Sequence, residues 1–220
     1  MSVVLERAPA TLTLACAALL ISVVLGIPAG IVAAVKRNSV SDAVIRVLAL
    51  LGQCMPAFWL GIMLIMLFAV KLGWMPTGGA EDGLRSLILP AFTLGVFSAA
   101  TICRLLRSNL IEVLGKEYID VAKAKGLPKS KIIGKHALKN AMSSIITILG
   151  MQFASLLGGS VITEQVFAWP GVGRLVIQSI TTSDFAVVEC IVFLMAVIFV
   201  VINFIVDVLY CVINPRVRLQ

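Results

Sequence analysis

The residues of this chain that could take part in chemistry are few, and they are densest at positions 117–140. This stretch carries six lysines, two acids, the only histidine of the chain and a Gly-Leu-Pro sequence that begins at Gly126. Lysines beside glycines can bind phosphate, but the sequence has no G-x-x-x-x-G-K-[ST] phosphate-binding loop. We therefore expect no ATP binding by this chain, and we expect the stretch to bind another molecule.

Two short helices with a sharp turn between them must hold these residues. Positions 117–125 have apolar residues at helical spacing and acids in the first turn, where negative charge complements the helix dipole. Gly126 tolerates the left-handed backbone that follows many helices, and Pro128 can begin the next helix. Two uses remain open at this point: docking of apolar side chains into a groove of another protein, or binding of the lysines to anionic lipid headgroups.

The rest of the chain is apolar enough to lie in a membrane. Hydrophobic residues make up 60% and charged residues 13%, with a mean hydropathy of +1.07, whereas a soluble domain has about 25% charged residues. A hydrocarbon core ~30 Å thick needs roughly 20 apolar residues in a helix. The sequence therefore predicts an all-α membrane protein, a polytopic bundle of about five transmembrane helices in a single domain over residues 1–220. The expected spans are 10–35, 47–70, 86–106, 141–163 and 186–213.

The basic residues predict the orientation, because Lys and Arg near short loops stay in the cytoplasm. Of the 18 basic residues, 14 fall on the side of the loop at 112–140 and of the C-terminus, and 4 on the other side. That loop is therefore expected in the cytoplasm, and an odd number of spans places the N-terminus outside. Because an external start so close to the first span is unusual, we expect an upstream helix to be missing from this chain.

Cofactors, metals and nucleic acid are not indicated. The five cysteines stand singly, without the CxxC spacing or histidine partners of a metal or redox site. They are Cys16, Cys54, Cys103, Cys190 and Cys211. The net charge of +7 is spread between membrane spans and has no aromatic platform for bases, so positive-inside topology explains it.

Polar residues inside spans are the candidates for a transport pathway. Gln53, Gln152 and Asp207 are the strongest of these, and Asn203 shares a helical face with Asp207. Hydrogen bonding between helices is the alternative role for all of them. Two prolines also lie inside the expected spans. Pro28 and Pro56 should each bend the helix that contains it.

Small residues predict close helix packing in the first span. Gly26 and Gly30 have the G-x-x-x-G spacing that lets a neighbouring helix approach. Packing within the chain and an interface between subunits are both open, and packing within the chain is favoured.

The segment at 164–184 is too polar to span and predicts an external hairpin with a turn at Trp169. Trp169 could anchor it at the headgroup level, where such rings are enriched. Together with Glu164, Trp169 could instead form part of an external gate and docking face.

The stretch at 117–140 resembles the cytoplasmic coupling loop of ABC-type import permeases, whose pattern is Glu-Ala-Ala, three residues, then Gly. Here Asp120 to Gly126 matches it in part, with Asp for Glu and Val for the first Ala. The likeness is closer to the dipeptide, oligopeptide and nickel branch, whose form EYI..A.AKGL followed by HAL.NA is similar to residues 117–141. Five further segments are similar to the first of the two paired permeases in that branch: 8–12, 51–59, 72–76, 166–175 and 214–216.

The resemblance implies the fold of a type I ABC importer permease that works by alternating access. It implies a second permease, two cytoplasmic ATPase subunits, an extracytoplasmic binding protein, and a location in a bacterial or archaeal cytoplasmic membrane. It also assigns coupling to the ATPase to six residues: Glu117, Asp120, Ala122, Lys125, Gly126 and Leu127. Ser144 departs from the family, where a proline often begins the next span.

The substrate stays open between di- or oligopeptides, a glutathione-like peptide and nickel or another metal chelate. A rival from another class is an ATP-independent carrier or channel that uses Asp207 or Glu189 as an ion site. Inverted repeats would support that rival, and the sequence shows none. A non-transporting scaffold subunit is the third possibility.

Overall fold

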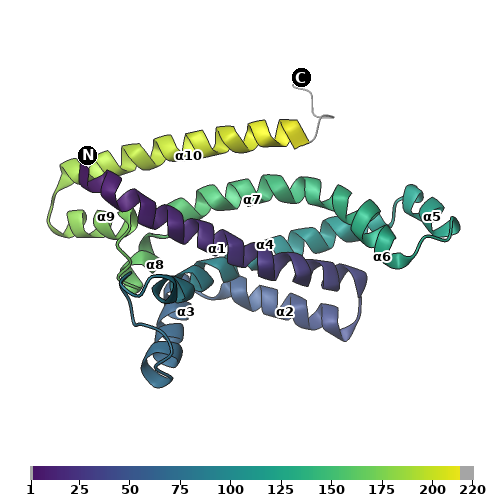
Figure 1. Ribbon diagram of the computed structural model, residues 1–220, viewed down its shortest axis with the longest axis horizontal. Coiled ribbons are helices and arrows are strands. Elements are labelled where there is room, and N and C mark those ends of the chain that lie inside the picture. The colour runs from purple at the N-terminus through teal and green to yellow at the C-terminus, as the bar shows by residue number, and fades with distance from the viewer. Residues whose placement is uncertain (1, 214–220) are drawn as a thin grey trace.

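The structure, a computed structural model, describes the backbone of residues 2–213 (Figure 1). Within that part, the side chains at 2, 143, 144, 206, 207 and 209–213 are not described. Every secondary-structure element over residues 2–213 is helical, which confirms the all-α prediction. The structure contains no membrane, but helix length and composition indicate which segments could cross one. Three helices in the described part qualify alone, and up to five crossings result if each of two bent helix pairs counts as one.

Two long helices form the centre of the bundle, α1 (Ser2–Val35) and α4 (Leu84–Leu114). A Cβ atom added to Gly26 would lie 2.8 Å from the carbonyl oxygen of Ala99 on α4, and one added to Gly30 would lie 2.9 Å from that of Cys103. Real Cβ atoms do not approach backbone so closely, so the two helices pack together only because these positions are glycine. The G-x-x-x-G prediction of packing within the chain is confirmed.

The second expected span is interrupted. Helix α2 (Val40–Cys54) stops before Pro56, and α3 (Ala57–Leu64) continues into the π-helix η1 (Ile65–Lys71) at an angle of 102° to α2. Proline has no backbone N–H and keeps the preceding residue extended, and Met55 accordingly has a ψ of 128°. The predicted bend at Pro56 is confirmed, and residues 47–70 form two helical pieces rather than one continuous helix. Figure 1 shows α3 projecting from the side of the bundle.

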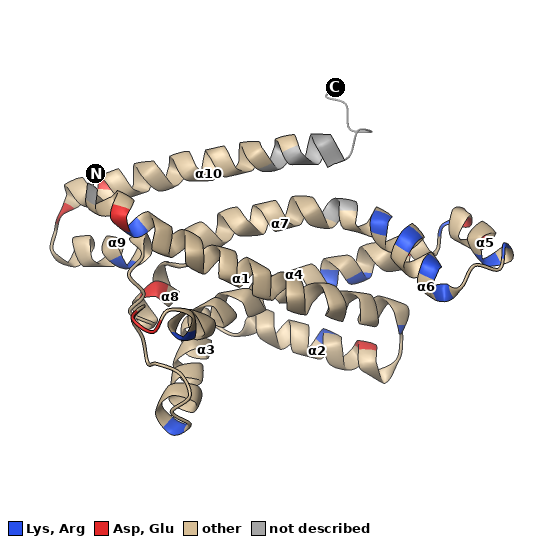
Figure 2. Cartoon of the chain, viewed as in Figure 1, with Lys and Arg blue, Asp and Glu red and all other residues tan. Residues whose placement is uncertain are grey.

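The lysine-rich stretch forms the end of the molecule opposite α8 and α9, and Figure 2 shows its blue residues gathered there. It comprises α5 (Glu117–Ala124), α6 (Lys129–Lys131) and the π-helix η2 (Ile132–Leu138). The last of these runs directly into α7 (Lys139–Gly159), and this helix pair bends by 51°. The second short helix predicted after the Gly126 turn is therefore continuous with α7, and together they form the candidate crossing expected at 141–163.

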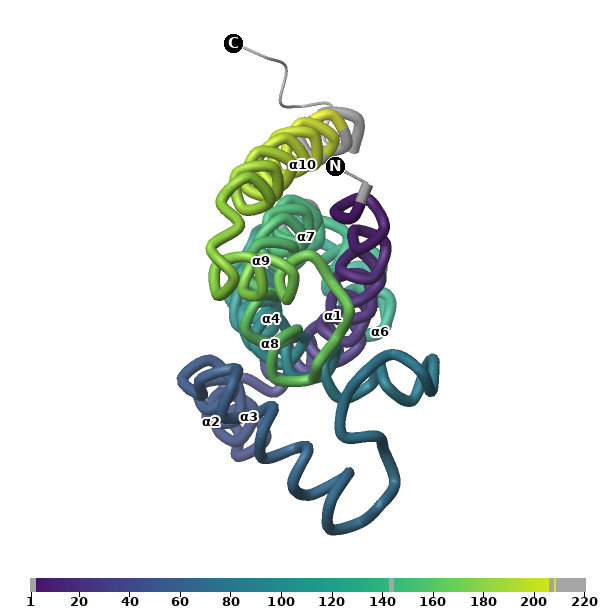
Figure 3. Tube along the Cα trace, turned by 90° about the vertical axis from the view of Figure 1, so that its left-hand side faces the viewer, coloured from purple at the N-terminus to yellow at the C-terminus, as the bar shows by residue number. Residues whose placement is uncertain are grey.

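The other end of the bundle is closed by α8 (Val161–Val166) and α9 (Val172–Thr181), as Figure 3 shows in a view along the bundle. The last helix, α10 (Phe185–Ile213), lies beside α7 and returns to the lysine-rich end. Only 6% of the most apolar stretch of this helix is buried within the chain, as expected of a helix that faces lipid or another subunit.

Candidate transport and coupling sites

Helix α5 and the turn after it have the predicted form. Glu117 and Asp120 lie in the first turn of α5, and Gly126 has a φ of +74°. The N–H of Gly126 donates to the carbonyl of Lys123 over 2.9 Å, and the N–H of Leu127 donates to that of Ala122 over 3.3 Å. These bonds satisfy carbonyls that the helix end would otherwise leave free. The helix, glycine turn and second helix are confirmed as a structure.

The two faces of α5 have different environments. Ile119 is fully buried and Ala122 is 7% exposed, and both pack into a core cluster with residues of α4, η2 and α7. On the opposite face Tyr118 is 41% and Val121 is 55% exposed. Ala122 therefore contacts its own chain, and its coupling role stays a prediction. The outward apolar residues of α5 are Tyr118 and Val121.

The remaining coupling candidates surround this exposed face. Glu117, Asp120, Lys125 and Gly126 are exposed, and Leu127 is half-buried against the same core cluster. Asp120 forms an ion pair of 2.8 Å with Lys123 one turn later. Both side chains are more than half exposed, so this pair contributes little to stability and leaves the charges available to a partner.

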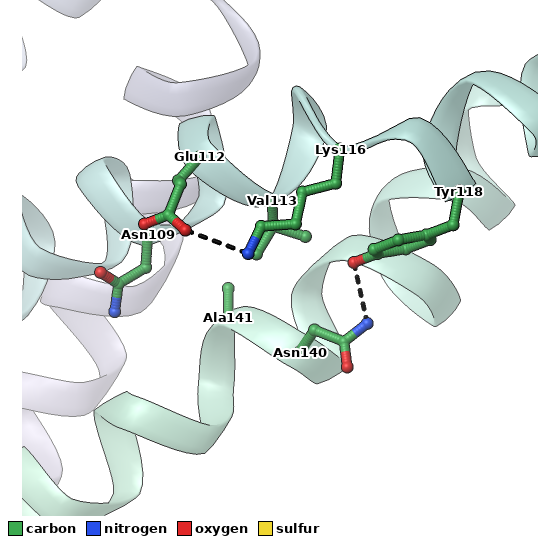
Figure 4. Close-up of a pocket in the computed structure, with 7 residues that line it drawn as sticks. All are labelled: Asn109, Glu112, Val113, Lys116, Tyr118, Asn140 and Ala141. Atoms are coloured by element: carbon green, nitrogen blue, oxygen red, sulfur yellow. Dashed lines mark hydrogen bonds and ion pairs between the residues drawn. The ribbon is translucent and has the colours of Figure 1, made fainter.

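A pocket of about 520 Å³ lies between the start of α5, the end of α4 and the beginning of α7. Figure 4 shows its lining, in which the amide of Asn140 donates to the hydroxyl of Tyr118 over 3.0 Å. The same amide donates to the carbonyl of His136 over 2.8 Å. Across the pocket Lys116 pairs with Glu112 at 3.1 Å. Asn140 thus links α5 to the beginning of α7, a contact that sequence spacing did not reveal.

A buried ion pair joins α2 to α4 near the lysine-rich end. The guanidinium of Arg107 donates twice to the carboxylate of Asp42, with its Nε at 2.7 Å and its Nη2 at 2.8 Å. The carboxylate is fully buried and also accepts the backbone N–H of Asn38 over 3.0 Å. The sequence analysis missed this pair, because residues 65 positions apart carry no local spacing signal.

Two of the pathway candidates meet in one cavity. Gln53 on α2 and Gln152 on α7 line a space of about 400 Å³ beside the helix break at Met55 and Pro56. Helix α4 supplies the wall between them with Thr93, Leu94, Phe97 and Ser98. The Nε2 atom of Gln152 is buried and has no hydrogen-bond partner within the described part of the chain. This atom therefore does not form the hydrogen bond between helices that was the alternative role expected for Gln152.

The two gate candidates belong to a different cluster, at the closed end. Glu164 is fully buried, and its Oε1 accepts hydrogen bonds from the hydroxyls of Thr11 at 2.8 Å and Ser160 at 3.0 Å. Its Oε2 accepts the N–H of Arg174 at 3.1 Å, and Thr11 accepts the N–H of Val172 at 2.9 Å. The carboxylate thus satisfies the first turn of α9 and complements the positive end of that helix.

Trp169 is fixed in the same cluster. It is 5% exposed, and its Nε1 donates to the carbonyl of Ala10 over 2.9 Å. A ring this deeply buried does not face lipid, so the expected role as a headgroup anchor is wrong. Gly171 follows in the turn, and a Cβ there would collide with the carboxylate of Glu164. The turn therefore requires glycine for this close approach.

The remaining candidates are less informative. The side chain of Asp207 lies outside the described residues, so its predicted role in the pathway stays a prediction. The amide of Asn203 donates to the carbonyl of Phe199, one turn earlier on its own helix, over 3.0 Å. Asn203 therefore has a local partner.

Comparison with known proteins shows which family this chain belongs to. The model of the family described as "Binding-protein-dependent transport system inner membrane component" matches residues 26–219. The chain is 40% identical to the di/tripeptide transport system permease protein DppB of Pseudomonas aeruginosa (strain UCBPP-PA14), across 96% of this chain and 71% of that protein. It is 43% identical to the glutathione transport system permease protein GsiC of Escherichia coli (strain K12), across 94% of this chain and 68% of that protein.

Solved structures show the same fold. The inward-facing MetNI methionine ABC transporter matches with a TM-score of 0.83 at 19% identity, across 97% of both chains. An amino acid ABC transporter crystallised with histidines matches with a TM-score of 0.76 at 17% identity, across 95% of this chain and 93% of that one. The fold class is confirmed by these likenesses, and the family model and the relatives together establish the identity. The chain belongs to the family of inner membrane permease components of binding-protein-dependent ABC transport systems.

Proposed function

We propose that this chain is the permease through which a bacterial or archaeal ABC importer moves di- or oligopeptides across the cytoplasmic membrane. The named activities of two relatives, di/tripeptide and glutathione transport, support a peptide substrate, since glutathione is itself a short peptide. A nickel chelate has less support, because neither of these two relatives is named for nickel transport. The energy comes from separate ATPase subunits, and a second permease completes the pathway.

The observation that carries the coupling role is the two-sided character of α5. Its outward face offers Tyr118 and Val121 to a cleft on an ATPase subunit, with the charges of Glu117, Asp120 and Lys125 around them. Its inward face is packed through Ile119 and Ala122, so a push on α5 reaches α4 and α7 directly.

Two further contacts would transmit a displacement of α5 to the other helices of the bundle. Asn140 ties α5 to the start of α7, and the buried pair of Asp42 and Arg107 ties α2 to α4. Helices joined in this way move as rigid bodies, which is the physical requirement for alternating access. The cluster around Glu164 closes the opposite end and belongs, in this proposal, to the external gate.

The test is transport by the assembled complex. A tag on this chain should retrieve a second permease and ATPase subunits from native membranes, and the reconstituted complex should accumulate dialanine only with ATP and a binding protein. The isolated chain should hydrolyse no ATP. Accumulation driven by an ion gradient in the isolated chain, without ATP, would establish the rival secondary carrier instead.

A further inference from the structure

We propose that the cavity beside the break between α2 and α3 is a binding station for the peptide group of the substrate, held by uncharged hydrogen bonds from Gln152 and Gln53. This inference rests on the proposed function, because it assumes that peptides pass through the chain. It assigns a recognition step to the permease itself, in addition to any recognition by the binding protein.

The first observation is the chemistry of the cavity wall. Its volume of about 400 Å³ lies within the usual range of small-molecule sites, roughly 300–1,000 Å³. The polar side chains that line it are amides and hydroxyls, namely Gln53, Thr93, Ser98, Gln152 and Ser155. None of the described lining residues is charged. Such a wall suits an uncharged polar group and gives no counter-charge to a metal ion.

The second observation is the unsatisfied amide of Gln152. Its Nε2 is buried without a hydrogen-bond partner among the described residues, and Gln152 is one of the residues that line the cavity. A buried donor without a partner is costly, more so at membrane depth, where water is scarce. No hydrogen bond from Nε2 to the described part of the chain fixes the amide, and rotation about its soft terminal torsion can present this donor to a ligand. An amide offers one donor side and one acceptor, which is the complement of a peptide group.

The third observation is the interrupted backbone. Met55 and Pro56 are extended and lie in the cavity wall. Within the membrane, non-helical backbone is tolerated where it is buried in protein or lines a cavity, and not where it faces lipid. Ala57 and Gly159 in the same wall are small, and a Cβ added to Gly159 would meet no atom within 4 Å, so this part of the wall leaves room for varied substrate side chains.

The native Cys54 allows a direct test, because it lines the cavity and carries a free thiol. A variant of the native complex that keeps Cys54 as the single cysteine of this chain is treated with a maleimide. Dialanine and S-methylglutathione should each slow the labelling of Cys54, whereas free alanine, which has no peptide group, should not. A matched variant that keeps only Cys16, an exposed residue of α1 outside the cavity lining, should show no protection.

Two substitutions separate recognition from packing. Gln152→Leu should raise the dialanine concentration that gives half-protection by about tenfold, the equivalent of one hydrogen bond. Thr147→Val is the control, because Thr147 is also on α7 with a buried, unpartnered hydroxyl, but it lies outside the cavity lining. That variant should retain wild-type protection.

The proposal is overturned if Cys54 of the complex does not react at all, which would mean that another subunit fills the cavity. Equal labelling with and without dialanine in a complex that still transports it would also overturn the proposal, and would leave the proposed function standing. If the complex instead lacks an ATPase and shows no ATP-dependent uptake, the proposed function fails. Protection of Cys54 by peptides would then still establish the station in a different kind of transporter.

Discussion

Thr11 on α1 and Glu164 on α8 are joined by a hydrogen bond of 2.8 Å, although 153 positions separate them in the sequence. Thr11 also accepts the N–H of Val172 at the start of α9. One hydroxyl therefore connects the beginning of the chain to both short helices at the closed end. Within the described part of the chain, the donors to the Glu164 carboxylate are the hydroxyls of Thr11 and Ser160 and the backbone N–H of Arg174, all of them uncharged.

Loss of the Thr11 hydroxyl should loosen the closed end. Thr11→Val leaves the N–H of Val172 and one lone pair of Glu164 without partners, at a cost of about 1–3 kcal/mol in unfolding free energy. The measurement is thermal unfolding in detergent, together with the rate of proteolysis within residues 167–184. Thr11→Ser should restore both values. Thr13→Val is the control, because the Thr13 hydroxyl is exposed and bonds only to Pro9 in its own helix. Equal effects at the two threonines would contradict the role of Thr11.

The turn after α5 should depend on Gly126. Its φ of +74° is strained for a β-branched residue, so Gly126→Val should disturb the turn by about 1–2 kcal/mol and impair ATPase association and transport. Amounts of the protein in the membrane should be unchanged, since no span is altered. Gly134→Val is the matched control, because Gly134 is in the same stretch, has no positive φ and has open space around it.

A second comparison tests how the loop works. Replacement of Lys129 and Lys131 by Gln should do much less than Gly126→Val, because both lysines are exposed. If the double Gln variant inserts normally but is inactive while Gly126→Val is active, the loop acts by surface electrostatics and the coupling role is wrong.

Adjacent residues of α5 should give opposite phenotypes. Val121→Asp places a charge on the exposed face and should abolish co-purification of the ATPase subunits while the chain stays folded. Ala122→Asp places an unpaired charge in the core cluster and should destabilise the chain itself. Co-purification and unfolding measured on both variants distinguish the effects. Normal ATPase association in Val121→Asp would exclude this face as the docking surface.

The buried pair of Asp42 and Arg107 should matter far more than an exposed pair. Arg107→Met removes both of its hydrogen bonds to the buried carboxylate of Asp42 and leaves only the longer ion pair with the exposed Arg46, at 3.4 Å. The expected cost is up to about 3–5 kcal/mol. Lys116→Met breaks the exposed pair with Glu112 and should cost less than about 1 kcal/mol. Denaturant titration of the two purified variants compares them. The double variant Asp42→Asn with Arg107→Met should recover part of the loss, because it removes the unpaired charge.

Local signals allowed much of this fold to be predicted. Run length and charge indicated the crossings, Gly126 and Pro128 indicated the turn, and Gly26 and Gly30 indicated close helix packing. Each of these depends on residues near one another in sequence. The orientation of α5 was missed because a helix of eight residues with apolar side chains on both faces does not reveal which face meets the core.

The sites were only partly predictable for a different physical reason. Gln53 and Gln152 stood out because polar side chains inside apolar spans are costly, and Glu164 was noticed only as part of the polar segment at 164–184. Thr11, the partner of Glu164, and the pair of Asp42 and Arg107 did not stand out, since they acquire their roles only from residues brought near by folding. Trp169 was misplaced because its ring suits a headgroup layer and a buried hydrogen bond equally well.

The break at Pro56 also constrains how the protein is made. Helix α2 has 15 residues, which at 1.5 Å each reach about 22 Å, well short of a hydrocarbon core ~30 Å thick. The segment from Ala57 to Lys71 has the same length and leaves at a steep angle. A ribosome that has completed only these two pieces therefore presents the insertion machinery with no full crossing. Because α2 and α3 both contact α4, we expect stable integration of this region to follow the synthesis of α4.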